Sequence, residues 1–351
     1  MQLTKRFLPT LFVLSAIIAV AKPANERTYA VGFYNLENLF DTCHDAGKND
    51  YEVLPEGTFK WTSLKYSHKL RNMARVLSEM GTDNLPSEGC AAIGVAEVEN
   101  AKCLEDLCQQ PPLKARNFQF VHIEGPDQRG IDCALLYNPR LFKVRNVTLI
   151  PYIYTHAEDA NRATRGYLTV SGTMGGNHVT IVVCHLPSRG APAYCREDGG
   201  QQLRVLKDSL MADDPDVKLL IMGDMNDDPH DLSMSEFLGA KRSQKDVETP
   251  SGLWNPWWDI LASCTGTLQY QGAWNLFDQI IVSRSLLNPD SQPATSSLKL
   301  CDYHIFRRDY LFQHEGKYKG NTLRTHAGGQ WLDGYSDHLP TLVYLMKEKR
   351  K

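Results

Sequence analysis

Short apolar runs recur along the chain, and several of them end directly in acidic or amide residues. The clearest is LLIMGDMNDDP at residues 219–229, where four apolar residues precede Gly223 and a cluster of Asp and Asn. A short apolar run closed by turn-forming residues predicts a buried strand. Because carboxylates are not left unpaired in apolar surroundings, the polar end of this strand indicates either a solvated turn or a site that holds a cation.

The same patterning predicts the other elements of the chain. Strands are predicted at residues 28–33, 91–95, 119–123, 131–137, 149–153, 165–174, 179–184, 219–222 and 277–282, with residues 335–344 feeding a last strand. Apolar positions at helical spacing predict helices at 64–80, 101–109 and 201–211. Residues 285–330 are predicted to form a long insertion or loop. This alternation of strands and helices around a central hairpin predicts one mixed α/β layered domain.

The N-terminus has the pattern of a signal peptide. Lys5 and Arg6 precede a mostly apolar stretch that is short for a membrane span, and residues 19–21 (AVA) form an A-x-A cleavage site. We therefore predict that residues 1–21 are removed and that residues 28–346 form the folded domain. The protein is expected to be exported, to the periplasm or outside the cell, with no stable membrane insertion. Export permits disulfides, but the nine cysteines are an odd number, so at least one thiol is unpaired within the chain.

Composition and charge narrow the function only slightly. The 351 residues are 42% hydrophobic, enough for one large or two smaller domains. The formal net charge of −3 lacks the basic excess of a protein that holds nucleic acid by charge alone. A small phosphate, or a nucleic acid held mainly through a metal, remains compatible with this charge. No feature predicts a protein partner.

Polar side chains stand at the ends of six of the predicted strands. These residues are Asn35 and Glu37, Glu97, His185, Asp224 and Asn226, Asp278, and Asp337 and His338. Carboxylate and amide oxygens suit Mg²⁺, with Mn²⁺ or Ca²⁺ as alternatives. Histidines suit proton transfer near neutral pH. Gathered at one edge, these groups would support phosphoester hydrolysis, in which a cation stabilises charge on the phosphate and a base deprotonates water.

Several of these positions also have simpler interpretations. Asn35 could cap a turn, and Glu99 is interpreted as a solvated neighbour of Glu97. Asp227 and Asp228 are interpreted as turn formers, and Arg189 and Arg324 as surface or loop residues. The aromatic side chains of the less regular region 230–275 are expected to pack a core, with a substrate platform as the alternative: Trp254, Trp257, Trp258 and Trp274.

The order of the motifs resembles a known family. YNLEN, VAEVEN, RGIDCALLYNP, CHLPSR, LIMGDMNDDP, FDQIIVS and YSDHLP, in this order, are similar to the endonuclease/exonuclease/phosphatase superfamily over about residues 28–346. GDMN and SDH at these separations are specific together. The resemblance implies a four-layer α/β/β/α sandwich with two packed mixed sheets and a site at one edge.

The resemblance also implies roles for the acids and amides. Glu97 is the main metal ligand, with Glu37 nearby, and Asp337 is a further acid on the metal side. Asn35 hydrogen-bonds the ligand carboxylate or the phosphate. Asp224 positions or deprotonates the attacking water.

The remaining roles concern the phosphate and the histidines. Asn226 binds the phosphate, and His338, paired with Asp278, contacts the phosphate or activates water. His185 matches the second histidine of the deoxyribonuclease-like branch. Two further residues are assigned to the substrate side of the site: Asp132, as the predicted partner that orients His185, and Arg165, as a contact to a substrate phosphate.

The leading hypothesis is an exported, divalent-metal-dependent phosphoesterase, specifically an endonuclease that hydrolyses nucleic acid. The alternative is a phosphatase or phosphodiesterase for small or lipid-linked phosphates, which the acidic charge favours. A non-catalytic binding module is a third class, and the complete set of acids and both histidines argues against it.

Overall fold

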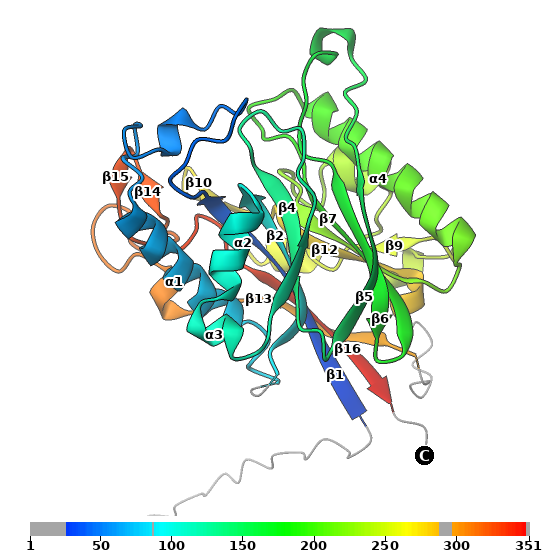
Figure 1. The fold of residues 1–351 in the computed structure, drawn as a ribbon. Coiled ribbons are helices and arrows are strands. Elements are labelled where there is room, and N and C mark those ends of the chain that lie inside the picture. Colours follow the sequence, from blue (N-terminus) through cyan, green and yellow to red (C-terminus); the bar gives the residue numbers. More distant parts are fainter. Residues whose placement is uncertain (1–25, 86–87, 288–296, 349–351) are drawn as a thin grey trace, which may run out of the picture.

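Two six-stranded sheets lie face to face in the computed structural model, which describes residues 26–85, 88–287 and 297–348 (Figure 1). The first sheet has the spatial order β13 (Lys299–Ile305), β16 (Thr341–Glu348), β1 (Glu26–Leu39), β2 (Cys90–Val98), β4 (Asp132–Tyr137) and β3 (Gln119–His122). The second has the order β5 (Phe142–Ile150), β6 (Tyr167–Met174), β7 (Asn177–His185), β8 (Lys218–Asp224), β12 (Asp278–Ser283) and β9 (Leu253–Trp254). Two hairpins stand apart from these sheets, β10 (Leu268–Tyr270) with β11 (Ala273–Asn275) and β14 (His326–Ala327) with β15 (Gln330–Trp331). The predicted signal peptide lies outside the described residues.

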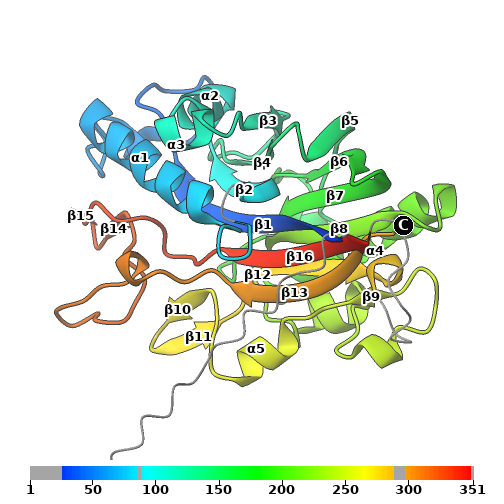
Figure 2. The same cartoon turned by 90° about the horizontal axis from the view of Figure 1, so that it is seen from below.

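Helices cover the outer faces of the sheet pair. The helices are α1 (Ser63–Glu79), α2 (Ala101–Cys108), α3 (Pro111–Lys114), α4 (Ala193–Asp213) and α5 (Trp258–Ala262), and the shorter turns are η1 (Tyr51–Val53), η2 (Ala157–Asp159), the π-helical η3 (Ser233–Phe237), η4 (Gln244–Asp246), η5 (Arg284–Leu286) and η6 (Asp309–Leu311). Figures 1 and 2 show α1, α2 and α3 together on one side and α4 on the other. The predicted α/β/β/α sandwich is therefore confirmed.

The strand β8 shows why the apolar run of residues 219–222 has no polar position. Leu220 and Met222 belong to the core between the two sheets, whereas Leu219 and Ile221 pack in the second core under α4 and η3. A strand covered on both faces is apolar throughout. Gly94 of β2 lets the sheets approach, because a Cβ there would lie 2.6 Å from the Met222 sulfur.

Two parallel strand pairs direct their carboxyl ends to the same edge. They are β1 with β2, and β7 with β8. In the second sheet, His185 is in register with Asp224, and Asp224 with Asp278 across the antiparallel β12. In the first sheet, β16 begins opposite Phe33, where β1 approaches its end. The strand order thus gathers the polar ends that the sequence analysis identified.

The structure corrects the prediction that residues 285–330 are a loop. They include β13, which pairs along β16 at the edge of the first sheet. Its residues are half exposed and alternate irregularly, so they lack the apolar run that predicts a buried strand. Helix α4 also begins before the predicted residue 201, and it contains Gly199 and Gly200. Added side chains there would come within 2.8 Å of Leu186 and 2.1 Å of the Ser233 carbonyl, so these glycines permit close packing.

Three of the four tryptophans pack in or against the core, as expected. Trp254 and Trp257 are buried in it and the partly buried Trp274 packs against it, whereas Trp258 is partly buried on α5. Cys133 and Cys184 are buried core residues. Within the described part of the chain, no helix combines the length and the apolar character that crossing a bilayer requires.

Candidate active site

The carboxylate of Asp224 lies at the centre of the predicted site. Its Oδ2 accepts a hydrogen bond of 3.0 Å from Asn35 Nδ2 and lies 3.5 Å from His185 Nε2 and 3.7 Å from His338 Nε2. Side chains alternate between the two faces of a strand, so Asp224 points to the same side as Met222, toward the other sheet. Burial raises the pKa of Asp224 to about 7, with the His338 cation opposing the shift. A buried carboxylate of this kind is suited to accept a proton near neutral pH.

Asn35 joins Asp224 to the predicted metal ligand Glu97. Its Nδ2 also donates to Glu97 Oε1 at 3.2 Å, and the other Glu97 oxygen accepts from the Asn38 backbone at 3.0 Å. Glu97 has a positive φ of 61°, and the strand pairing is irregular beside it. Such bulges redirect side chains at sheet ends and are frequent next to active sites. The irregular backbone therefore turns the Glu97 carboxylate into the site.

Glu37 takes a different direction from the one that the sequence suggested. A regular strand would put it on the same face as Asn35, but Glu37 has a φ of 49°. Its carboxylate instead accepts hydrogen bonds from Arg324 Nε at 2.9 Å and from the Thr325 backbone at 2.7 Å. Burial and the neighbouring charge of Asp337 raise the pKa of Glu37 to about 7. Glu37 thus belongs to an ion network beside the site.

His338 and Asp278 form the pair that the sequence predicted. His338 Nδ1 and Asp278 Oδ2 are 2.7 Å apart, and Asp278 is fully buried. Burial lowers the pKa of His338, but the carboxylates of Asp278 and Asp224 outweigh it and raise the pKa well above 6.5. His338 is therefore a cation at neutral pH, and its Nε2 faces Asp224. Asp337, next in the chain, pairs with Arg324 at 2.8 Å.

His185 has the opposite electrostatic environment. Burial, with the Arg165 and His338 cations, lowers its pKa well below 6.5, so the imidazole is neutral. Its Nε2 lies 3.5 Å from Asp224 and 4.0 Å from Glu97. Its Nδ1 is buried and has no hydrogen-bond partner among the described residues. The Nε2 proton is thus the one that can reach an acceptor, and it faces the carboxylates.

The predicted partner of His185 is wrong, because Asp132 binds other groups. Asp132 accepts hydrogen bonds from the Gly125 backbone at 3.1 Å and contacts His122 Nε2 at 3.1 Å. Arg165 lies close to His185 instead, and donates to its backbone carbonyl at 3.0 Å. The guanidinium also binds the Leu186 carbonyl and Asp127. Arg165 lines the cavity described next, yet its donors are occupied within the protein, so it positions the His185 backbone.

These groups line a cavity of about 530 Å³ at the sheet edge. Glu97, His185, Asp224, Asn226, Asp337 and His338 all contribute to its wall. Asn226 has a φ of 50° and donates through Nδ2 to the Leu186 carbonyl at 3.0 Å. The structure thus brings together the predicted residues from both sheets, with Glu37 and Asp132 facing other partners.

Three residues near the site escaped the sequence reasoning. Arg129 and Arg162 line the cavity, and Arg129 donates to the side-chain oxygen of Asn38. Lys69 is buried on α1, where it donates to Thr325 Oγ1 at 2.6 Å. Arg129 lies in the RGIDCALLYNP motif, which is a signal that could have found it. Lys69 gives none, because it is a lysine in an ordinary helical pattern.

Arg324 is a partly exposed loop residue, as predicted, and it also bridges Glu37 and Asp337 beside the site. Arg189, which is partly exposed, instead holds Asp228 at 3.1 Å and Asp231 at 2.8 Å. Asp228 also accepts a hydrogen bond of 2.6 Å from the Leu276 backbone N–H.

Asp227 pairs with Arg196 at 2.7 Å and accepts from Ser233 Oγ at 2.7 Å. Asp227 and Asp228 therefore brace the loop after β8, which agrees with their interpretation as turn residues rather than catalysts.

The donor set of the cavity fits a divalent cation. Ligand atoms of Glu97, His185 and Asp224 lie within 4.8 Å of one another. The Glu97 and Asp337 side chains keep 15% and 20% of their surface exposed, so both carboxylates reach the cavity. Mg²⁺ commonly binds through one or two carboxylates together with substrate phosphate and water. Glu97 and Asp337 are the residues that would hold it.

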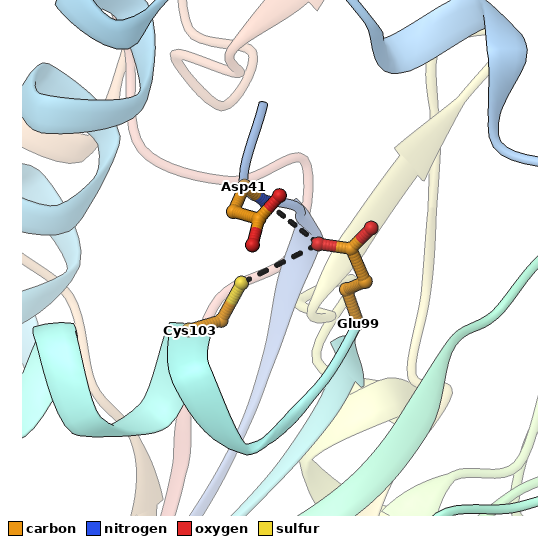
Figure 3. Close-up of side chains that lie close together, drawn as sticks. All are labelled: Asp41, Glu99 and Cys103. Atoms are coloured by element: carbon orange, nitrogen blue, oxygen red, sulfur yellow. Dashed lines mark hydrogen bonds between the residues drawn. The ribbon is translucent and has the colours of Figure 1, made fainter. Parts of the chain in front are cut away.

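Glu99 lies behind the site and is not the solvated residue that the sequence suggested. It is 1% exposed and accepts hydrogen bonds from the Asp41 backbone at 2.7 Å and from the Cys103 thiol at 3.6 Å (Figure 3). The side chain turns away from Glu97 because it follows β2 at the start of α2. Burial raises the pKa of Glu99 to about 8. Its carboxyl group is therefore largely protonated at pH 7.

Glu99→Gln is expected to stabilise the protein relative to the wild type as pH rises. The folded pKa of Glu99 lies above the unfolded value, so its contribution to stability is complete below about pH 4.5 and is lost as pH rises toward 8. Glutamine does not titrate. The difference in unfolding free energy should change by about 4 kcal/mol between pH 5 and pH 8.5, as measured by urea denaturation. A difference that stays constant with pH would contradict the protonated carboxyl.

Comparisons with known proteins agree with this geometry. No curated protein matches the chain. An endonuclease/exonuclease/phosphatase family protein from Bacteroides thetaiotaomicron has the same fold, with 14% identity over 93% of this chain and 100% of that one and a TM-score of 0.56. The mannosyl-6-phosphatase Bt3783 from the same organism is 14% identical over 90% and 99% of the two chains, with a TM-score of 0.55. D. rerio TDP2 complexed with a single-strand DNA product is 14% identical over 91% of this chain and 98% of that one, with a TM-score of 0.52.

At 14% identity, these structural matches show that the fold is shared and nothing more. A family model described as the Endonuclease/Exonuclease/phosphatase family matches residues 30–347, which is nearly the whole chain. With this match, the chain belongs to the endonuclease/exonuclease/phosphatase family.

Proposed function

We propose that the protein is an exported, divalent-metal-dependent phosphoesterase that acts as an endonuclease on nucleic acid. The observation that carries the proposal is the position of Asp224, whose carboxylate lies between the Nε2 atoms of a cationic His338 and a neutral His185. This arrangement supplies a proton acceptor, a cation and a neutral donor around one small space. Phosphoester hydrolysis requires these groups together.

Asp224 accounts for the proton transfer that activates water. It takes a proton from the attacking water, and the water oxygen forms a bond to phosphorus. Asn35 and the backbone of Asn226 hold Asp224 in place, with hydrogen bonds of 3.0 and 2.9 Å. As the bond from phosphorus to the leaving oxygen breaks, that oxygen takes up a proton from solvent water and departs as an alcohol.

The cation of His338 stabilises the negative charge that develops on the phosphate oxygens, and Asp278 keeps it protonated. His185, being neutral, offers an Nε2 proton to a phosphate oxygen without adding charge. A divalent ion held by Glu97 and Asp337 would further neutralise charge on the phosphate and the leaving oxygen. Enzymes of this family use divalent metal ions, and Mg²⁺ suits these oxygen ligands best.

The alternative is a phosphatase or phosphodiesterase for small or lipid-linked phosphates. The net charge of −3 supports it, because a duplex groove is usually lined by an excess of basic residues. The shared fold with a mannosyl-6-phosphatase is compatible with it. The shared fold with TDP2 in complex with a DNA product is equally compatible with nucleic acid. Arg129 lines the cavity and bonds the uncharged Asn38 side chain, and its positive charge favours the first proposal.

A plasmid-nicking assay separates the two. Purified protein should convert supercoiled to nicked DNA with Mg²⁺ or Mn²⁺, and EDTA should abolish the conversion. The same preparation is tested in parallel on sugar phosphates, phosphorylated inositols and a phosphocholine lipid. Turnover of these phosphates without cleavage of DNA or RNA under any metal would replace the nuclease proposal with its alternative.

Export to the periplasm or the exterior forms part of the proposal and rests on the N-terminal pattern. A mature N-terminus at Lys22, read by mass spectrometry of protein from an exported fraction, is the expected result. Recovery of the full chain beginning at Met1 would contradict it.

A further inference from the structure

A second cavity, of about 270 Å³, opens beside the phosphate site. Its wall is formed by Glu37, Asn38, Val53, Phe59, Trp61, Arg324, Thr325 and the turn residues 326–329. Two short connections separate it from the catalytic cavity. The Asn38 backbone donates to Glu97 at 3.0 Å, and Arg324 pairs with Asp337 at 2.8 Å. A substrate bound at Glu97 and Asp337 can therefore extend into the second cavity.

Three aromatic rings, those of Phe59, Trp61 and His326, contribute to this wall. The ring centroid of His326 lies 4.9 Å from Phe59 and 5.7 Å from Trp61. The Trp61 indole is 2% exposed, and its Nε1 donates to the Phe40 carbonyl at 2.9 Å. The indole is thus fixed in orientation and has no donor left for a ligand. Because Trp61 is almost fully buried, the partly buried Phe59 supplies most of the carbon surface that these two rings offer an occupant.

His326 adds an uncharged ring to this wall. Burial and the cations of Lys65, Lys69 and Arg324 lower its pKa to about 4, so it is neutral at physiological pH. Its Nε2 is buried and has no hydrogen-bond partner among the described residues. The histidine therefore presents an aromatic face and one nitrogen whose hydrogen-bonding capacity is unused.

The rim of the cavity is open on one side and polar on the other. Gly328 and Gly329, at the turn between β14 and β15, have positive φ angles of 56° and 79°, and an added Cβ would meet no atom within 4 Å. Arg324 is 41% exposed and provides a guanidinium at the border with the phosphate site. The cavity thus combines aromatic walls, a cation on the phosphate side and an unobstructed entrance.

We propose that this cavity is a subsite for one nucleobase of the substrate, adjoining the phosphate that is cleaved. The inference rests on the proposed nuclease function and specifies how that site selects its substrate. A volume of 270 Å³ is below the range of about 300–1,000 Å³ for drug-sized ligands, so it suits one ring system rather than an extended chain. Unstacked bases bind to aromatic rings and guanidinium planes through their faces.

The test compares two substrates with equal phosphate content. One is a single-stranded oligodeoxynucleotide, and the other is an oligomer of the same length built from base-free tetrahydrofuran nucleotides. The ratio of their kcat/KM values measures what the bases contribute. For the wild type we expect a ratio of about 10 or more in favour of the base-bearing strand, which is the effect that stacking of one base typically has.

Two opposite changes to the cavity should lower this ratio toward 1. Phe59→Ala removes an aromatic wall, and Ala327→Phe fills the space from the β14 side. Tyr318→Ala is the matched control, because Tyr318 is an exposed aromatic residue that lines neither cavity. Thermal unfolding of each variant establishes that it is folded. A ratio that persists in both cavity variants, or a loss that affects both substrates equally, overturns the subsite.

Calorimetry separates failure of the subsite from failure of the nuclease proposal. If the wild type cleaves neither oligomer and also cleaves no DNA or RNA in the nicking assay, the nuclease proposal fails. Binding of dAMP with Mg²⁺ then still tests the cavity, because Ala327→Phe should abolish the binding if a base occupies it, and Tyr318→Ala should not. No detectable binding of dAMP to the wild type, or equal binding to the wild type and Ala327→Phe, would overturn the inference.

Discussion

Asp224→Asn is expected to lower kcat by about 10³-fold or more while the protein remains folded, because removal of a general base typically costs about 10²–10⁴-fold. The amide keeps the shape of the carboxylate but cannot take a proton from water. It also removes a negative charge that lies 3.7 Å from His338 Nε2. Steady-state hydrolysis of the best substrate from the nicking and phosphate assays measures the effect.

Asp228→Asn is the matched control for this change. Asp228 follows β8 in the same loop and is similarly buried, but it pairs with Arg189 and accepts the Leu276 backbone instead of facing the histidines. We expect Asp228→Asn to cost stability and to leave kcat within about tenfold. An Asp224→Asn enzyme that is folded and keeps more than a tenth of the wild-type kcat would refute the assignment of Asp224.

Asp278→Asn is expected to have the second largest effect, lowering both activity and stability. Asp278 is fully buried, and its Oδ2 lies 2.7 Å from His338 Nδ1. Removing one partner of a buried ion pair costs about 3–5 kcal/mol, because the other charge is left without compensation. Activity should fall by about 10²-fold or more at pH 7, since His338 would no longer stay protonated.

The direction of the pH dependence follows from the raised pKa of His338. A raised pKa means that the stabilisation by this pair is complete below the unfolded value of 6.5 and is lost only as pH rises through the folded value, which lies well above 6.5. In Asp278→Asn the pKa falls, so the alkaline limb of the kcat profile should move to lower pH. The profile is measured from pH 5 to pH 9.5, together with urea denaturation.

Asp132→Asn controls for loss of a buried histidine–carboxylate pair. Asp132 and His122 are 3.1 Å apart and both side chains are about 5% exposed, but neither faces Asp224. This variant should lose stability and retain the position of the alkaline limb. If Asp132→Asn moves the limb as far as Asp278→Asn does, the pairing of His338 with Asp278 is not what sets the profile.

Hydrophobic patterning was sufficient for the central strands of the fold. The runs before Gly223 and before Glu97 are apolar at consecutive positions because helices cover the outer faces and the second sheet covers the inner ones. The edge strand β13 was not predicted, because it is not covered on both faces. Its residues 299–305 are half exposed, so burial imposes no apolar run on them.

The pairing of His338 with Asp278, which the family resemblance implied, depends on how the two sheets pack. His338 precedes β16 of the first sheet and Asp278 begins β12 of the second, and these two strands contact each other across the core. The partner of His185 could not be found in this way. The contact to His185 comes from a loop residue, Arg165, which donates to the His185 carbonyl. Asp132 instead hydrogen-bonds with Gly125 and His122.

The sequence by itself determined the layered fold class and the set of residues at the strand ends. Both depend on local periodicity and on the chemistry of individual side chains. Only the tertiary structure decided where those side chains point. The positive φ angles at Glu37 and Glu97 turn one carboxylate toward Arg324 and the other toward Asn35. Strand alternation cannot predict such turns, because they are backbone conformations that only the surrounding contacts stabilise.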